Sequence, residues 1–183
     1  LIVVGSVLFS VKTVVGYCYN ADDSALNVQV VDSAQTKLKK GTNIFLVREK
    51  DIIEEVESQI PNIKVINVER RFPSDVYINY IKIYEYFVVK SGSDYLYVSN
   101  ESKILRKTST QDKDARIKLL FSGEPDSTTE GHYLFNESSP YYAVSNSLMA
   151  SLSRVEKYDN LIEMFDFIDI SYVDKNELFI KTK

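Results

Sequence analysis

The apolar positions in the first half of the chain predict a strand followed by two helices. Residues 10–19 are rich in β-branched side chains, which favour a strand. Residues 22–41 and 48–60 then place apolar side chains at every fourth position, the spacing of one helical face. Gly41 and Pro61 can end these two helices. The apolar positions of the two faces are Leu26, Val30, Ala34 and Leu38, and then Ile52, Val56 and Ile60.

Alternating apolar and polar positions follow the second helix and predict strands. Residues 63–72 read as a half-buried strand that ends in a turn at Pro73. A second run, from Val76 to Val89, would be about 45 Å long as one strand, and its apolar positions change parity halfway. We expect a bulge or twist there and a domain boundary near Val89. The positions assigned to the buried side of the first strand and its turn are Ile66, Val68, Arg70 and Phe72.

The second half of the chain predicts a mostly β unit with one or two helices. Residues 95–107 and 167–183 each read as a hairpin, and residues 115–123 read as a strand between them. Residues 138–158 carry a helical apolar stripe behind Pro140, which suits the first turn of a helix. The predicted fold class is therefore α+β.

Composition and charge exclude several classes of function. The chain has 183 residues and a net charge of −4, with basic and acidic residues mixed along its length. A nucleic-acid-binding protein needs a concentrated basic face, so that class is disfavoured. Cys18 is the single cysteine, which excludes an internal disulfide and a zinc site built on cysteine pairs. We predict no catalytic residues, no metal site and no cofactor.

Two catalytic alternatives remain open from the residue types alone. Cys18 and His132, the single histidine, could form a nucleophile–base pair. Glu163, Asp166 and Asp169 could supply paired carboxylates for glycoside chemistry, which requires a defined separation between two acids and a raised pKa on one of them.

Residues 1–9 form a nearly unbroken apolar run. As a helix this run would rise about 14 Å, which is half of what a bilayer core requires. It could be a first strand or the tail of a membrane helix. We favour the tail of a truncated N-terminal membrane helix.

The order strand, helix, helix, strand, strand, together with several short motifs, resembles a POTRA domain. More narrowly, the chain resembles the POTRA and β-domains of the FtsQ/DivIB bacterial cell-division proteins. Residues 95–105 and 167–182 are similar to two hairpins of that family's β-domain. The POTRA motifs are Gly41-x-Asn43-Ile44-Phe45, Pro61-x-Ile63 and Val68-x-Arg70-x-Phe72-Pro73, followed by Val76 and Ile78.

The resemblance implies a domain plan and a function. Residues 10–89 would form a β-α-α-β-β POTRA domain, and residues 90–183 a β-domain that lacks its last strands. The protein would be a non-enzymatic, single-pass protein of the cytoplasmic membrane with most of its chain outside the cytoplasm, at the division septum. Its partners would be other membrane-anchored division proteins, FtsB/DivIC-like and FtsL-like. The alternatives are a POTRA module that binds substrate strands in an outer-membrane transport or assembly system, and a carboxylate enzyme.

Two strand edges are the candidate partner-binding sites that this resemblance suggests. In the POTRA order, the strand at 63–72 lies at a sheet edge, where unpaired backbone groups can accept another strand. The last strand is the second candidate edge. Either could instead be structural, as a charged edge that discourages aggregation or as an ordinary paired strand. The candidate contact residues are Lys64, Asn67, Glu69 and Arg71 on the first edge, and Leu178, Phe179 and Ile180 on the second.

Overall fold

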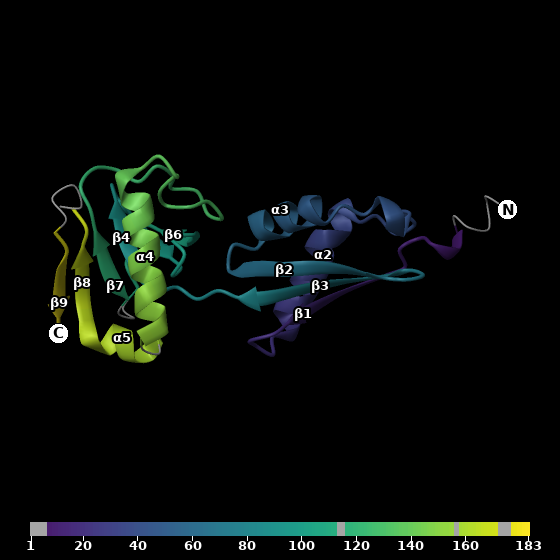
Figure 1. Cartoon of the computed structure of the whole chain (residues 1–183), viewed down its shortest axis with the longest axis horizontal. Helices are drawn as coiled ribbons and strands as arrows, with labels where there is room; N and C mark the ends of the chain where they lie inside the picture. The colour runs from purple at the N-terminus through teal and green to yellow at the C-terminus, as the bar shows by residue number, and fades with distance from the viewer. Residues whose placement is uncertain (1–6, 113–115, 156–157, 172–176) are drawn as a thin grey trace. The chain divides into compact units, whose positions relative to one another are not determined.

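The computed structural model describes residues 7–112, 116–155, 158–171 and 177–183, and it divides the chain into two compact units (Figure 1). The units meet between Ile83 and Tyr84. The boundary expected near Val89 therefore falls inside the second unit, where Phe87–Ser91 forms a strand that pairs only with strands of that unit. Each unit has its own hydrophobic core, so each is described separately.

The first unit has the β-α-α-β-β order of a POTRA domain. Its three strands form one sheet in the order β1-β3-β2, with β1 parallel and β2 antiparallel to β3. The two helices pack against one face of this sheet (Figure 1). The elements are β1 (Thr13–Cys18), α2 (Ser24–Lys37), a short 3-10 helix (Ile44–Leu46), α3 (Glu49–Gln59), β2 (Ile63–Arg71) and β3 (Asp75–Lys82).

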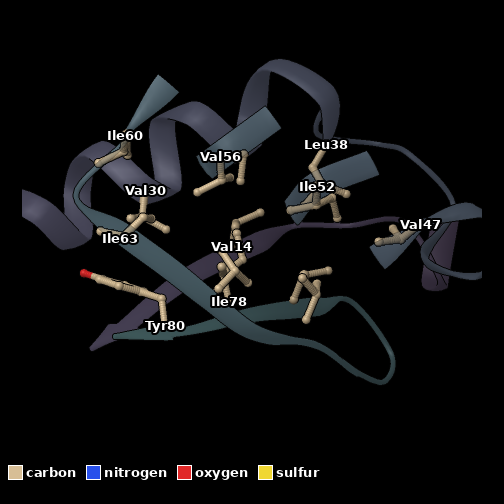
Figure 2. Packing of buried hydrophobic residues seen from close by; sticks show 14 of the residues in the cluster. Val14, Val30, Leu38, Val47, Ile52, Val56, Ile60, Ile63, Ile78 and Tyr80 are labelled. Atoms are coloured by element: carbon tan, nitrogen blue, oxygen red, sulfur yellow. The ribbon is translucent and has the colours of Figure 1, made fainter. Parts of the chain in front are cut away.

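The predicted helical faces form the core of this unit. All seven of the expected apolar positions on α2, α3 and their C-caps are buried. Figure 2 shows Ile52 and Val56 of α3 directed toward Val14 and Ile78 of the sheet. The side chain of Asp23 caps α2 by accepting a hydrogen bond from the backbone N–H of Leu26 at 3.0 Å, as expected of an N-cap aspartate.

The buried face assigned to β2 was wrong at three of its four positions. The pairing of β2 with β3 shifts register between Val65 and Asn67, so the strand contains a bulge at Ile66. A bulge changes which side chains face the core. The bulge leaves Ile66 exposed between the buried Val65 and Val68. Arg70 and Phe72 are also exposed, because they lie at and beyond the end of the strand.

The run from Val76 to Val89 also differs from the expectation of one bulged strand. It is two strands that belong to different units: β3 ends at Lys82, and β4 begins at Phe87. The parity change in the sequence therefore records the end of one sheet and the start of another. The backbone N–H of Ile83 still donates to the carbonyl of Asn62 at 2.8 Å, which keeps the end of β3 in the first unit.

The second unit is a six-stranded sheet in the order β6-β5-β4-β7-β8-β9, with helix α4 across one face (Figure 1). The β5–β6 and β8–β9 pairs are antiparallel hairpins, as the sequence predicted, whereas β4, β7 and β8 run parallel to one another. Its elements are β4 (Phe87–Ser91), β5 (Asp94–Val98), β6 (Ile104–Thr108), β7 (Ile117–Leu120), α4 (Pro140–Val155), α5 (Tyr158–Met164), β8 (Phe165–Asp169) and β9 (Phe179–Thr182).

The expected membrane-helix tail lies mostly outside the described residues. Of residues 1–9, the structure describes Val7 and Leu8 in a helical turn, followed by Phe9. Across the part of the chain that the structure describes, we find no helix with the length and apolar character needed to span a bilayer.

Candidate docking surfaces

The four candidate residues of β2 lie together on the face of the first sheet that the helices leave open. The strand register pairs Lys64 with Ile81, Asn67 with Asn79, Glu69 with Tyr77 and Arg71 with Asp75. The side chains between them, such as Val68, point to the opposite face and into the core. β2 is one of the two edge strands of this sheet among the described strands, as expected from the POTRA order.

Three of these four side chains belong to one hydrogen-bonded network. The amide of Asn79, which is only 4% exposed, donates to Asn67 Oδ1 at 2.7 Å and to Glu69 Oε1 at 2.8 Å. Arg71 donates to Glu69 Oε2 at 3.0 and 3.2 Å, and its guanidinium carbon lies 4.0 Å from the ring centroid of Tyr77. The hydrogen bonds to Glu69 raise the pKa of Arg71. The network fixes the positions of these three side chains on the open face.

Two glutamates of α3 bind the backbone of β2. The N–H of Val65 donates to Glu57 Oε1 at 2.7 Å, and the N–H of Val68 donates to Glu49 Oε1 at 3.0 Å. These two N–H groups therefore point away from β3, into the position that an added strand would occupy. An incoming strand would have to displace both carboxylates. Contact at β2 is consequently favoured through the side chains of the open face, not through the strand's backbone edge.

The sequence-based interpretation missed this role of Glu49 and Glu57. The helix dipole is a sufficient explanation for Glu49 in the first turn of α3, although not for Glu57 in its last turn, and nothing in the local pattern indicates which strand either residue reaches. The glutamates lie 19 and 8 residues from the N–H groups that they accept. Only the packing of α3 beside the edge strand brings these groups together.

The strand β9 presents an exposed apolar edge in the second unit. It is the outermost described strand on its side of the six-stranded sheet. The candidate residues there are Leu178, Phe179 and Ile180, and their exposed fractions are 43, 49 and 44%. All three candidates therefore lie at an accessible edge, with Leu178 immediately before the strand and the other two within it.

Charged side chains hold β9 to its neighbours. Lys118 of β7 and Lys181 of β9 reach the two oxygens of Asp166 on β8, at 3.2 and 3.3 Å. The hydrogen bonds from Lys118 and Lys181 lower the pKa of Asp166. The general acid of glycoside chemistry needs a raised pKa, and Asp166 does not have that property.

The opposite edge of the same sheet is covered. Strand β6 exchanges backbone hydrogen bonds with the loop between β7 and α4: Ile104 donates to the carbonyl of His132 and accepts from Gly131, both at 2.8 Å. Glu130 of that loop accepts from the backbone N–H of Lys107 at 2.8 Å. This is a familiar way to protect an edge strand from unwanted pairing, and it leaves β9 as the more accessible edge of this unit.

The residues considered as a nucleophile–base pair belong to different units of the described structure. Cys18 lies in the first unit and His132 in the second. Within the described ranges, no group of three or more His, Cys, Asp or Glu side chains is arranged to hold a metal ion.

Comparison with known proteins identifies the first unit. Residues 29–85 match the sequence model of the POTRA domain, FtsQ-type, over roughly a third of the chain. The match spans most of α2 and all of α3, β2 and β3, so it contains the open face and both edge-binding glutamates. The comparison with curated proteins found no match to the chain. Residues 29–85 of the first unit therefore form a POTRA domain of the FtsQ type.

Proposed function

We propose that this protein is a scaffold of the bacterial division machinery that holds other septal proteins through two surfaces, the edge strand β9 and the open face of the POTRA sheet. The FtsQ-type POTRA domain is the observation that carries the proposal, since it supports a division-related, non-enzymatic role in protein–protein interaction. The two surfaces are our assignment.

The shape and chemistry of β9 support its use as a docking edge. An extended partner segment can add to an edge strand, gaining affinity from main-chain hydrogen bonds and specificity from alternate side chains. Phe179 and Ile180 offer large apolar side chains at such an edge, close to half exposed. The charged bridge from Lys118 through Asp166 to Lys181 holds β9 in place before a partner arrives, which reduces the ordering cost of binding.

The open POTRA face suits a polar partner surface. Lys64, Glu69 and Arg71 place charges of both signs on neighbouring positions of one strand. Charge patterns of this kind contribute orientation and selectivity more than affinity. We assign the main binding energy to β9 and the selection of partners to the POTRA face.

The proposed partners are membrane-anchored division proteins of the FtsB/DivIC and FtsL kinds. We place the protein at the septum, in the cytoplasmic membrane, with both units outside the cytoplasm. The FtsQ type of the POTRA domain supports the septal location in general terms. The apolar run at residues 1–9 supports attachment to the membrane.

Photo-crosslinking in the native bacterium tests the proposal at single residues. Benzoylphenylalanine is introduced at Ile180 or at Arg71 in the full-length protein, and adducts are identified by mass spectrometry after irradiation. Val28, an exposed position on α2, is the matched control for labelling of a solvent-facing residue outside both surfaces. We expect adducts with single-pass division proteins at Ile180 and Arg71, and none of these adducts at Val28.

Two outcomes would overturn the proposal in different ways. Division proteins captured equally well at Val28 would show that the two surfaces are wrongly assigned. Capture of outer-membrane assembly factors, without any division protein at the three positions, would replace the septal role with that of a transport or assembly POTRA module.

A further inference from the structure

Three phenylalanine rings gather on the surface at one end of the POTRA unit. The ring centroid of Phe45 lies 5.3 Å from that of Phe9 and 5.1 Å from that of Phe72. Phe45 and Phe72 are 56 and 55% exposed, and the neighbouring Leu46 is 72% exposed. Aromatic side chains stabilise a protein or an interface most when they are buried. A cluster of exposed rings therefore indicates a surface that another molecule covers.

The backbone around these rings is well ordered by hydrogen bonds. The N–H of Ile44 donates to the carbonyl of Phe9 at 2.8 Å, and Asn43 forms an isolated β-bridge with Ser10. The side chain of Asn43 also accepts from the N–H of Phe45 at 3.0 Å. The rings are therefore presented on a fixed support, with the buried Ile44 beneath them.

The same end of the unit is positively charged. Three segments meet there through backbone hydrogen bonds: residues 7–12, 37–48 and 72–74. Together they contain five basic residues and no acidic residue, although the chain as a whole carries a net charge of −4. The five are Lys12, Lys37, Lys39, Lys40 and Arg48, and all are exposed.

Charged groups at the border do not reverse this balance. Asp51 lies at a shallow pocket with Leu46 and Arg48, and Asp75 begins β3 after the turn. Arg70 borders the same turn on the other side, whereas the neighbouring Arg71 is neutralised by its ion pair with Glu69. The exposed rings are thus surrounded by a net excess of basic side chains.

The chain also reaches this end of the unit through apolar residues. Val7 and Leu8 precede Phe9 and are exposed, and the sequence before them is apolar. The turn between β2 and β3 lies at the end of the unit where this N-terminal segment emerges (Figure 1). β1 and β3 both start here and run in the same direction, so the chain continues to the second unit from the other end of β3.

We propose that this end of the POTRA unit rests on the surface of a bilayer that contains anionic lipids. The docking patch consists of the exposed apolar side chains with the lysines beside them. Aromatic and apolar side chains insert at the headgroup level of a membrane, and basic side chains bind anionic headgroups. The combination of both, continuous with an apolar segment, favours a lipid surface over a protein partner. The patch is defined as Val7, Leu8, Phe9, Phe45, Leu46 and Phe72, with Lys39 and Lys40.

This inference does not depend on the proposed division role. The docking patch lies at the end of the POTRA unit where β3 begins, whereas the chain leaves for the second unit from the end where β3 stops. Docking would fix the orientation of the POTRA unit relative to the membrane.

The absence of tryptophan from the sequence allows a direct test. A Phe45→Trp variant of the 183-residue chain carries one indole in the patch. Tyr19→Trp is the matched control, because Tyr19 is also 56% exposed and follows the far end of β1. Both are titrated with vesicles of phosphatidylcholine and phosphatidylglycerol, with and without brominated phosphatidylcholine as a quencher within the bilayer.

We expect the emission of Phe45→Trp to shift to shorter wavelength and to be quenched by brominated lipid, while the emission of Tyr19→Trp is unchanged. In a Lys39→Glu/Lys40→Glu background, vesicle binding should weaken by about tenfold or more, since each basic residue near an anionic surface contributes measurably to binding. The control pair Lys64→Glu/Lys90→Glu, also exposed but outside the patch, should change binding less than about twofold.

Three results would overturn the inference. The first is no change in Phe45→Trp emission with vesicles, and the second is equal quenching of Phe45→Trp and Tyr19→Trp. The third is a shift of Phe45→Trp emission that grows with protein concentration without lipid, because a second copy of the chain would then be what covers the patch.

Discussion

The binding of the β2 backbone by α3 leads to a specific prediction for Glu57→Ala. The substitution removes the carboxylate that accepts from the N–H of Val65 and leaves the rest of α3 in place. Glu57 is half-buried, and its hydrogen bond joins a charged acceptor to a part-buried donor. This class of hydrogen bond contributes roughly 1.5–3 kcal/mol, and the access of water at an edge strand reduces the expected loss to about 1 kcal/mol.

Amide hydrogen exchange measures this loss at the residue concerned. A loss of about 1 kcal/mol corresponds to roughly fivefold faster exchange, since 1.4 kcal/mol is tenfold in an equilibrium constant. We expect that acceleration at the Val65 amide in Glu57→Ala and little change at Val68. Glu49→Ala should produce the reverse pattern, because its carboxylate accepts from Val68. Urea unfolding followed by far-UV circular dichroism should report a similar loss for Glu57→Ala.

Two controls separate this effect from a general loss of helix stability. Glu54 lies on α3 with an exposed side chain that pairs with Lys50 at 3.7 Å, so Glu54→Ala should leave the Val65 amide unchanged. Glu57→Gln keeps a hydrogen-bond acceptor without the charge, so its loss of stabilisation at the Val65 amide should be about half that of Glu57→Ala.

Unchanged exchange at Val65 in Glu57→Ala would refute the reasoning, as would the same acceleration in Glu54→Ala. In either case the outer edge of β2 would not be closed by α3. Strand addition at β2 would then become as plausible a docking mode as strand addition at β9.

Further predictions concern the packing of β1 and the acid stability of β9. Gly16→Val should destabilise the first unit by about 1–3 kcal/mol in thermal unfolding. The reason is that a Cβ at Gly16 would lie 3.1 Å from the carbonyl oxygen of Asn27 on α2. An unchanged melting temperature would contradict this close packing. Asp166 has a lowered pKa from its bonds to Lys118 and Lys181, so its stabilising contribution is present above the unfolded pKa near 4 and is lost as the pH falls through the folded pKa. The melting temperature of the wild type should therefore be higher than that of Asp166→Asn at neutral pH. If the difference in melting temperature persisted in acid, it would argue against the ion-paired carboxylate.

The helices of the POTRA unit could be predicted from the sequence because their signal is local. Spacing of apolar residues by four positions reports one buried face whatever that face packs against. Leu26, Val30, Ile52 and Val56 are accordingly all buried. The strand order follows from resemblance to the POTRA family, and β2 lies at the sheet edge where that resemblance places it.

The details that decide how the surfaces work could not be predicted in the same way. The bulge at Ile66 depends on the register between β2 and β3, which alternation along one strand does not specify. The exposure of Phe72 follows from its place in the turn against Phe45, a residue distant in sequence. In both cases the pattern of one segment was interpreted without the partner segment that determines it.

The sequence therefore determines the helices of the first unit, their core faces and the POTRA type of that unit, since these depend on periodicity and short motifs. The tertiary structure determines which edges are accessible: α3 carboxylates close part of β2, a loop covers β6, and β9 is exposed. The physical reason is that an edge is defined by what lies beside it. The backbone groups on the outer side of an edge strand are bonded, or left accessible, by groups that are far away in the chain. Only folding brings those groups beside the strand.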